Sequence, residues 1–273
     1  MFGMIGSLLC LYCGSGCQAS IVASSLAFHP PSPSYDINLV TDTDKNDSKD
    51  DSKDDTKGDQ TTTKPIYSIS FLRDPPNIDV EAGAHIYKNP SVHIVHHIPS
   101  FSSSSSTIPL LYFKSAGAQF TLIYSHGNAT DLGAMFSVLL GISVHMKMNV
   151  VGYDYSGYGP RLQGNKAHIQ TTEQLTYNDI DAVYKWLIDS KLVKIPAEEV
   201  IVYGQSVGSG PSCYLASTQP VAGLVLHSAI MSGLRVLTPS RLLCCFDIFP
   251  NIDRIKQVHC PVLVIHGQVW CCC

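Results

Sequence analysis

The sequence carries little charge and has no cluster of basic residues. Its 18 Lys and Arg stand against 22 Asp and Glu, which gives a formal net charge of -4 over 273 residues. Eight of the aspartates and four of the lysines fall between Asp42 and Asp59, and the rest of the chain is balanced at 14 acidic and 14 basic residues. Binding to a nucleic-acid backbone needs a concentrated positive surface. The composition therefore argues against nucleic acid as a partner.

Long uninterrupted apolar runs are also missing. Residues 1–28 contain no charged side chain, but Gly14, Ser15, Gly16 and Gln18 interrupt the apolar stretch. A membrane-spanning helix needs about 20 predominantly apolar residues. A secretory signal needs a basic start and a continuous apolar core. The first residues fit neither pattern, so we expect no spanning helix and no cleaved leader there.

The ten cysteines do not have the spacing of a disulfide framework, so a secreted scaffold held by disulfides is not expected. They fall into three groups: Cys10, Cys13 and Cys17; Cys213, Cys244, Cys245 and Cys260; and Cys271, Cys272 and Cys273. The pair Cys10 and Cys13 has the spacing of half a zinc site, but a second pair is missing. We therefore expect neither a metal nor another cofactor.

A low-complexity segment divides the chain. Residues 40–64 are rich in Asp, Lys, Ser and Thr and contain no aromatic side chain. Such a segment cannot bury enough apolar surface to offset the entropy of ordering. We expect a disordered linker between an N-terminal region, residues 1–39, and one large domain, residues 65–273. An acidic interaction tail or a metal-binding tract is the alternative. A serine-rich stretch, residues 100–107, predicts a surface loop.

Beyond this loop, short apolar runs alternate with glycine-rich turns and amphipathic stretches. This alternation predicts an α/β fold with a mostly parallel, doubly wound sheet. The predicted strands are residues 120–125, 149–154, 199–204, 221–228 and 261–267. Residues 172–190 predict a helix whose apolar residues recur at near-helical spacing and should cover one face of the sheet. These core residues are Leu175, Ile180, Val183, Tyr184 and Leu187.

A G-x-S-x-G sequence, residues 204–208, directly follows the third predicted strand and precedes a helix-compatible stretch. Strand, sharp turn and helix in this order are the context of a nucleophile elbow, in which the serine is the nucleophile. Gly204 and Gly208 would leave room around the strained turn at Ser206. The helix that follows would direct its positive end at the reacting centre. Ser206 is therefore the candidate nucleophile.

The sequence HGNATDLG, residues 126–133, follows the first predicted strand and is the natural partner of the elbow. Gly127 would let the backbone approach the substrate, and the N–H groups of Asn128 and Val207 would form an oxyanion hole. The alternative is an ordinary glycine turn with Asp131 at a helix start. Asp154 and the SGYG after it should line the site as a tight turn. Asp154 is not the expected catalytic acid, because triad acids in this fold follow the nucleophile.

Seven stretches carry a family resemblance: LAFHPPSPSY, LIYSHGNATDLG, VVGYDYSGYG, NDIDAVYKWL, VIVYGQSVGSGP, LVLHSAIMSGLRV and CCFDIFPNIDRIKQVHCPVLVIHG. On these strings the chain resembles the alpha/beta hydrolase domain-containing protein 17 family over most of residues 1–40 and 110–267. The resemblance implies an α/β-hydrolase fold and a membrane-attached serine hydrolase that removes palmitate from protein cysteines. It implies S-palmitoylated membrane proteins and membrane lipid as partners, on the cytoplasmic face of the plasma membrane or endosomes.

In that family the N-terminal cysteine cluster is itself palmitoylated, which corresponds here to Cys10, Cys13 and Cys17. Their spacing supports the same expectation, because cysteines at i, i+3 and i+7 share a helix face, here among leucines and an isoleucine. Acylation of two or more of them would turn marginal membrane binding into stable anchoring. We therefore expect a lipid-anchored N-terminal region rather than a metal site.

The chain departs from the family after Gly267. In the family the triad acid follows the strand that corresponds to residues 261–267, and the histidine follows the next strand. Here only QVWCCC follows, and none of these residues is Asp, Glu or His. We therefore expect the fold to lack its last strand and helix, with an exposed apolar edge. Acids and histidines that precede this point should be structural: Asp247, Asp253, His227, His259 and His266.

Three functions compete at this stage. The first is a palmitoyl-protein thioesterase that works through Ser206 and an acyl-enzyme. The second is a lipase, esterase or serine peptidase on the same elbow, which the motif alone does not distinguish. The third is a membrane-anchored fragment without catalysis that binds acylated partners. A serine without its histidine and acid is a weak nucleophile, so we expect the 273-residue chain to be essentially inactive.

Overall fold

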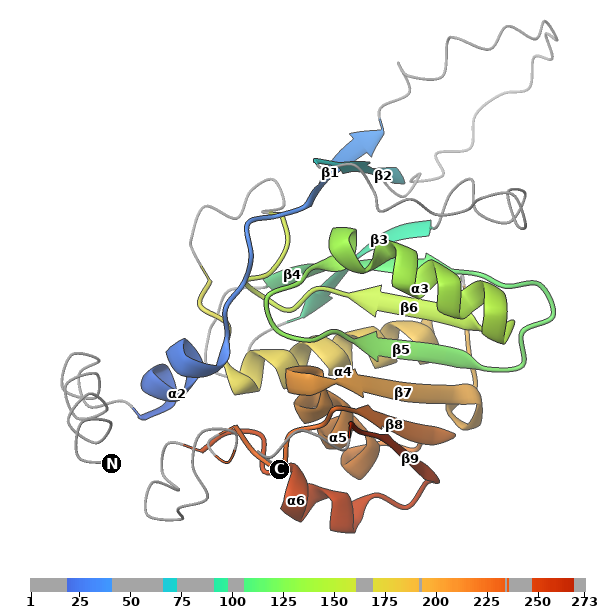
Figure 1. The fold of residues 1–273 in the computed structure, drawn as a ribbon. Helices are drawn as coiled ribbons and strands as arrows, with labels where there is room; N and C mark the ends of the chain where they lie inside the picture. Colours follow the sequence, from blue (N-terminus) through green and yellow to red (C-terminus); the bar gives the residue numbers. More distant parts are fainter. Residues whose placement is uncertain are drawn as a thin grey trace, which may run out of the picture.

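The computed structural model describes residues 19–40, 66–72, 91–97, 106–160, 169–191, 193–233, 235 and 247–267. These residues form a nine-stranded sheet with helices on both faces (Figure 1). The strands are β1 (Tyr35–Val40), β2 (Ile66–Phe71), β3 (Ser91–His97), β4 (Ser106–Phe113), β5 (Thr121–Ser125), β6 (Asn149–Tyr153), β7 (Val200–Gln205), β8 (Gly223–His227) and β9 (Val262–Ile265). The helices are α2 (Ala19–Ala27), α3 (Leu132–Met146), α4 (Glu173–Asp189), α5 (Ser209–Thr218) and α6 (Asn251–Arg254), with short 3-10 segments η3 (Ala197–Glu199), η4 (Ser206–Gly208) and η7 (Ile255–Gln257).

The sheet has an antiparallel half and a parallel half. Its strand order is β1-β2-β3-β4-β6-β5-β7-β8-β9, and pairing is antiparallel from β1 to β6 and parallel from β6 to β9. In the parallel half, Ser125 lies opposite Gly204, and Gln205 lies opposite His227. The carboxyl ends of β5, β7 and β8 therefore meet at one edge. Ligands of open α/β sheets bind at this edge.

Two hydrophobic cores lie on opposite faces of the sheet, as a doubly wound fold requires. Alternate strand residues point to alternate faces. Leu122 and Val150 pack with α3 in one core, whereas Ile123 and Val151 pack with α4 and α5 in the other. The predicted fold class is confirmed.

The five predicted strands and the predicted helix all form within a few residues of their expected bounds. Helix α4 begins after Thr172, whose side chain accepts a hydrogen bond of 3.2 Å from the Leu175 N–H and so caps the first turn. All five of its apolar positions named above were expected in the core. The structure buries Ile180, Val183, Tyr184 and Leu187, while Leu175 is half-buried.

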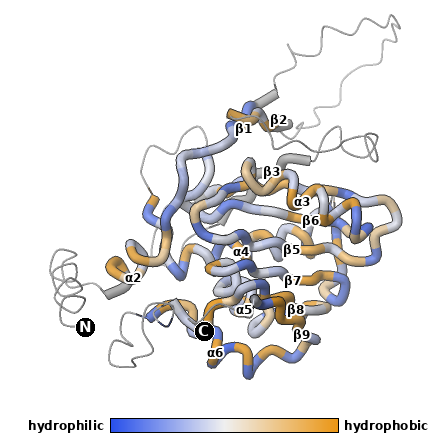
Figure 2. The backbone as a smooth tube through the Cα atoms, in the orientation of Figure 1, coloured by the Kyte–Doolittle hydropathy of each residue, from blue (hydrophilic) through white to orange (hydrophobic). Residues whose placement is uncertain are grey.

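Strand β9 lies at the edge of the sheet with its apolar side chains exposed. Leu263 and Val264 are 57% and 61% exposed, and Val262 and Ile265 are each more than 40% exposed. Figure 2 shows this strand as part of a strongly hydrophobic region of the backbone. Exposure on both faces of β9 means that no described helix covers it on either side. The expectation of an exposed apolar edge is met.

Residues 19–40 run along the carboxyl ends of the strands and join the sheet as β1 (Figure 1). Phe28 packs edge-on against Phe249, with ring centroids 5.8 Å apart. The cysteine cluster, residues 41–64 of the predicted linker and residues 100–105 lie outside the described residues. The linker was predicted to begin at residue 40, but β1 extends to Val40. The serine-rich stretch was predicted as a loop to residue 107, but β4 already begins at Ser106.

Candidate active site

Ser206 occupies a strained turn between β7 and α5. Its φ is +52°, in the left-handed region that residues with a Cβ rarely adopt. The chain leaves β7 at Gln205, turns through η4 and enters α5 at Ser209. This turn presents Ser206 at the carboxyl edge of the sheet, where it is half-buried. The strand, turn and helix of a nucleophile elbow are all present.

The two flanking glycines are required by packing. A Cβ added to Gly204 would lie 2.6 Å from the Gly208 carbonyl oxygen and 2.7 Å from Ser209 Cα. A Cβ added to Gly208 would lie 2.7 Å from the His126 carbonyl oxygen and would also overlap the Ser125 carbonyl. Real Cβ atoms do not approach backbone this closely, so any larger residue would displace the turn. Packing in the turn therefore leaves room only for glycine at positions 204 and 208.

The loop after β5 lies directly beside the nucleophile. A Cβ added to Gly127 would lie 3.8 Å from both Ser206 Cβ and the Gln205 carbonyl oxygen, which are ordinary contact distances. Gly127 is thus not required by packing within the protein. A side chain at Gly127 would instead stand against Ser206, in the space that an acyl carbonyl would need.

The two candidate oxyanion donors come from the loop and from the elbow. Val207 is the second residue of η4, so its N–H is among the first of a helical segment and lacks an acceptor within it. The N-terminal end of η4 and α5 also carries partial positive charge. Asn128 follows Gly127, and its side chain, not its backbone, makes its hydrogen bonds to Ala27, His29 and Tyr158. Their role as oxyanion donors stays a prediction.

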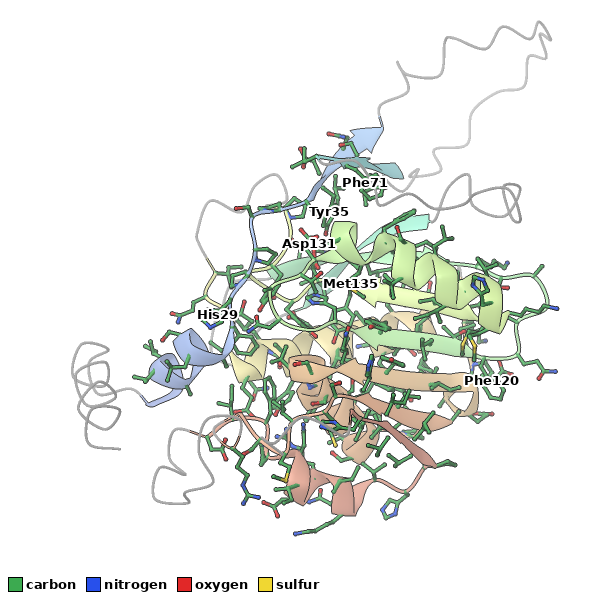
Figure 3. The ribbon with its side chains drawn as sticks, viewed as in Figure 1. His29, Tyr35, Phe71, Phe120, Asp131 and Met135 are labelled. Carbon is green, nitrogen blue, oxygen red and sulfur yellow. The ribbon has the colours of Figure 1, made fainter. Side chains whose placement is uncertain are left out.

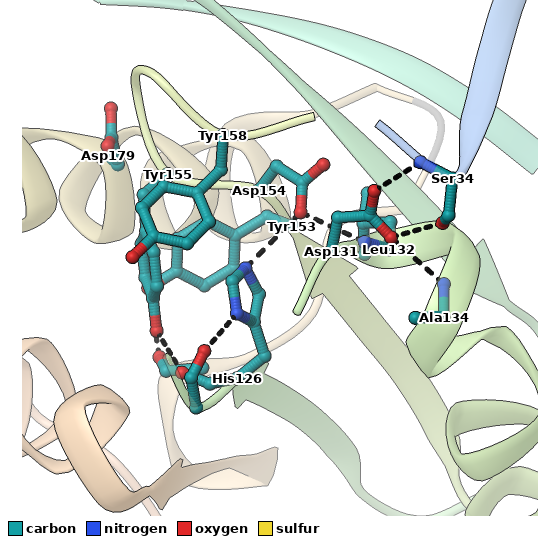
Figure 4. A network of polar contacts seen from close by, with 12 residues as sticks. Ser34, His126, Asp131, Leu132, Ala134, Tyr153, Asp154, Tyr155, Tyr158 and Asp179 are labelled. Carbon is teal, nitrogen blue, oxygen red and sulfur yellow. Dashed lines mark hydrogen bonds and ion pairs between the residues drawn. The ribbon is translucent and has the colours of Figure 1, made fainter. Parts of the chain in front are cut away.

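A buried polar network lies behind the loop (Figure 4). Asp154 accepts hydrogen bonds from the Tyr35 hydroxyl at 2.6 Å and from the Leu132 N–H at 3.0 Å. His126 Nδ1 lies 2.8 Å from the Gly127 carbonyl oxygen. Its Nε2 lies 3.2 Å from Asp154 Oδ1, although the approach is not that of a hydrogen bond. Asp154 therefore holds the loop and the N-terminal segment together.

Tyrosines hold the remaining groups of this network. The Tyr155 hydroxyl donates to the His126 carbonyl at 2.6 Å, and Tyr153 and Ser125 share a hydrogen bond of 2.9 Å. Burial, together with the neighbouring Asp154 carboxylate, raises the pKa of the Tyr35 hydroxyl well above its usual value. Burial does the same to the pKa of Tyr155. These hydroxyls stay protonated at neutral pH and act as hydrogen-bond donors.

The SGYG turn after Asp154 closes over the same network. Gly157 and Gly159 have φ values of +96° and +67°. A Cβ on Gly159 would also collide with the Asp154 carboxyl group. The turn is tight, as expected, and it places Tyr158 beside Asn128.

No histidine among the described residues forms a hydrogen bond with Ser206 Oγ. His227, at the end of β8, is bonded through Nδ1 to the Tyr203 hydroxyl at 2.8 Å. His259 and His266 are exposed, before and after β9. Asp253 forms an exposed ion pair with Lys256 at 2.9 Å. The structural role expected for these groups and for Asp247 stays a prediction.

The sequence patterns did not predict that the N-terminal segment takes part in the site. Ala27, His29, Ser34 and Tyr35 all contact the loop or the network behind it. The contacts use mainly backbone groups and join positions about a hundred residues apart, so they leave no periodic signal. Their one trace in the sequence was LAFHPPSPSY, among the strings that carry the family resemblance.

The described residues hold no group of three or more His, Cys, Asp or Glu side chains placed to bind a metal ion. The cysteine cluster at positions 10, 13 and 17, a candidate for lipidation, lies outside the described residues. Two cysteines that are described, Cys213 and Cys260, are free thiols. Burial raises the pKa of Cys213 to about 11.

Comparison with known proteins gives a specific relationship. No family model matches the chain. Human alpha/beta hydrolase domain-containing protein 17B is 35% identical over 262 residues, which cover 95% of this chain and 78% of that protein. The chain belongs to the alpha/beta hydrolase domain-containing protein 17 family. Mouse protein 17C is 33% identical over an alignment of 279 positions, which covers 96% of this chain and 79% of the relative. A Caenorhabditis elegans protein of similar name, aho-3, is 46% identical over 151 residues, covering 55% of this chain and 43% of that protein.

Membership in the protein 17 family makes this chain an α/β hydrolase and fits the elbow at Ser206. The resemblance recognised in the sequence is confirmed. The identity extends over the N-terminal segment as well as the sheet, because it covers 95% of the chain.

Proposed function

We propose that this member of the protein 17 family is a serine hydrolase that cleaves palmitoyl thioesters from S-acylated membrane proteins. The observation that carries the proposal is the left-handed turn at Ser206, which sits between β7 and α5 and beside the loop that bears Asn128. A strained serine in this position has little structural use. It is explained by the need to expose a nucleophile next to backbone donors.

In the proposed reaction Ser206 Oγ attacks the thioester carbonyl carbon. The carbonyl oxygen becomes an oxyanion that accepts hydrogen bonds from the Asn128 and Val207 N–H groups. The carbon–sulfur bond then breaks, the cysteine of the substrate leaves and takes up a proton, and the acyl group remains on Ser206. Water hydrolyses this ester, releasing the fatty acid and returning the proton to Ser206.

A thioester suits this site chemically. A cysteine thiol has a pKa of about 8.5, far below that of an alcohol, so it leaves the tetrahedral intermediate with little help from a general acid. An oxygen ester would depend more on a histidine that donates a proton. A good leaving group therefore suits acyl transfer to Ser206.

The N-terminal region supports a substrate at a membrane surface. Helix α2 begins two residues after Cys17 in the sequence and ends beside the site at Ala27, which accepts a hydrogen bond from Asn128. Nine helical residues span about 14 Å. If Cys10, Cys13 and Cys17 carry acyl chains, the site is held close to the lipid surface that displays S-acylated proteins. No described helix has the length and apolarity to cross a membrane.

Substrate comparison tests the proposal. The assay uses the continued chain, which is this chain extended by the part of human protein 17B that follows the counterpart of β9. It is incubated with an S-palmitoyl peptide, the corresponding O-palmitoyl serine peptide and a short-chain ester, each beside its Ser206→Ala variant. We expect Ser206-dependent release of palmitate, with the thioester preferred over the oxygen ester. Preference for the short-chain ester would instead indicate a general esterase.

Binding without catalysis is a second candidate, favoured by the lack of a histidine contact at Ser206 Oγ among the described residues. It predicts that S-palmitoyl peptides bind with equal affinity to the protein and to Ser206→Ala, and that neither hydrolyses them.

A further inference from the structure

The Asn128 side chain is bound on three sides by groups from outside its own loop. Its Nδ2 donates to the Ala27 carbonyl at 2.7 Å. Its Oδ1 accepts from the His29 N–H at 2.9 Å and from the Tyr158 hydroxyl at 2.7 Å. Two of these three partners belong to residues 27–35, the N-terminal strap. The strap therefore grips the residue whose backbone N–H is the proposed oxyanion donor.

A second set of contacts fixes the far end of the same loop. Asp131 accepts from the Ser34 N–H at 2.7 Å and is also bonded to the Ser34 hydroxyl. The same carboxylate caps α3 by accepting from the Ala134 N–H at 3.0 Å. Figure 3 labels His29 and Tyr35 on the N-terminal segment and Asp131 at the start of α3. The strap thus clamps the loop at both Asn128 and Asp131.

The loop needs outside support to keep its shape. Ala129 has a φ of +54°, a left-handed conformation that is unfavourable for a residue with a Cβ. Asn128 Oδ1 also accepts from the Ala129 N–H at 3.0 Å, so the side chain that the strap holds stabilises this turn directly. Releasing the side chain would free the turn and shift the Asn128 N–H.

We propose that the N-terminal strap, together with Tyr158, positions the Asn128 N–H as an oxyanion donor. This inference rests on the proposed function of Ser206. Preorganised donors act in the transition state, and small displacements cost much of their effect. Asn128 is then a donor through its backbone and a positioning residue through its side chain. The region that carries the candidate lipid anchor is part of the site rather than a separate tether.

One matched pair of variants isolates the strap. His29→Pro removes the N–H that Asn128 accepts, whereas His29→Ala keeps this N–H and removes only a side chain that is exposed. Tyr158→Phe removes the second donor to Asn128, together with the contact of the Tyr158 hydroxyl to the His29 backbone. The readout is reaction of Ser206 in the continued chain with a fluorophosphonate probe, resolved into a maximal rate and a half-saturating concentration. Circular dichroism and thermal melting establish that each variant is folded.

We expect His29→Pro and Tyr158→Phe to lower the maximal rate by about tenfold, less than the roughly 10²–10³-fold known for full loss of a donor. The half-saturating concentration should stay the same, because the donor acts on the transition state. His29→Ala should react like the parent. Equal rates in His29→Pro and His29→Ala would overturn the proposal, as would an effect confined to the half-saturating concentration. If His29→Pro does not fold, Tyr158→Phe decides by the same criterion.

Failure of the proposed function is distinguished by Ser206→Ala. If the parent and Ser206→Ala react with the probe alike, Ser206 is not the nucleophile. Amide hydrogen exchange of residues 126–133 then tests the strap without any reaction. Faster exchange in His29→Pro than in His29→Ala supports the positioning of the loop, and equal exchange overturns it.

Discussion

Replacing Gly208 by alanine is the sharpest structural test of the elbow. Gly208 has a φ of -62°, which alanine adopts freely, so backbone strain plays no part. The added Cβ would meet the Ser125 and His126 carbonyl groups, with the latter at 2.7 Å. Both are backbone groups of β5 and the loop beside Ser206, which cannot rotate away as a side chain could.

The expected cost is at the upper end of overpacking in a core, about 3 kcal/mol. For a domain of this size each kcal/mol lowers the melting temperature by about 2–4 °C, so Gly208→Ala should melt about 6–12 °C lower. The collision also pushes the loop away from the elbow, so in the continued chain the reaction of Ser206 with a fluorophosphonate probe should be lost along with the stability.

Two other glycines serve as controls. A Cβ on Gly141, within α3, meets nothing within 4 Å. Gly141→Ala should therefore stabilise the protein by about 0.5–1 kcal/mol and leave the reaction of Ser206 intact. A Cβ on Gly127 makes only ordinary contacts, so Gly127→Ala should fold normally and still hinder the approach of the probe. Thermal melting followed by circular dichroism measures all three. A melting temperature for Gly208→Ala equal to that of the parent would refute the packing argument.

Three further predictions concern the N-terminal region, the low-complexity segment and the buried thiol. Replacing Cys10, Cys13 and Cys17 by serine should move the protein from the membrane fraction to the soluble fraction. Each buried methylene of an acyl chain contributes about 0.8 kcal/mol, so two chains account for durable attachment. Unchanged fractionation would contradict lipid anchoring through these cysteines. Deletion of residues 41–64 should leave the melting temperature nearly unchanged, and a large drop would show that the segment packs on the domain. The pKa of Cys213 is raised to about 11 in the folded protein, against about 8.5 in an unfolded chain, so the unfolded state loses this proton first as pH rises. The stability that Cys213 contributes is therefore present below about pH 8.5 and is lost as the pH rises to about 11. The free energy of unfolding, measured in urea across this range, should fall less steeply with pH in Cys213→Ala than in the parent. An identical fall in both proteins would refute the raised pKa of Cys213.

The parallel half of the sheet could be predicted because each of its strands is a buried apolar run between turns. The elbow could be predicted because sterics demand glycine at 204 and 208. The antiparallel half was harder. Strand β1 pairs with β2 across the low-complexity segment, and its sequence YDINLV alternates too briefly to stand out. Neither the length of β1 nor its distance in the sequence from β2 indicates that the two strands pair.

The strap was beyond prediction for another physical reason. Its hydrogen bonds to Asn128 come from the Ala27 carbonyl and the His29 N–H, which are backbone groups and do not depend on the side chain at either position. Sequence patterns report side chains, so a site completed by backbone groups from about 100 positions away is invisible in them. For Asp154 the order of the strands was enough, because triad acids in this fold follow the nucleophile. In the structure the Asp154 carboxylate accepts hydrogen bonds from the Tyr35 hydroxyl and the Leu132 N–H.

Hydrolysis of an S-palmitoyl peptide tests the central claim most directly. The continued chain is compared with its Ser206→Ala variant. We predict Ser206-dependent release of palmitate by the continued chain. Release of palmitate at the same rate with and without the Ser206 hydroxyl would contradict the claim that Ser206 is the nucleophile.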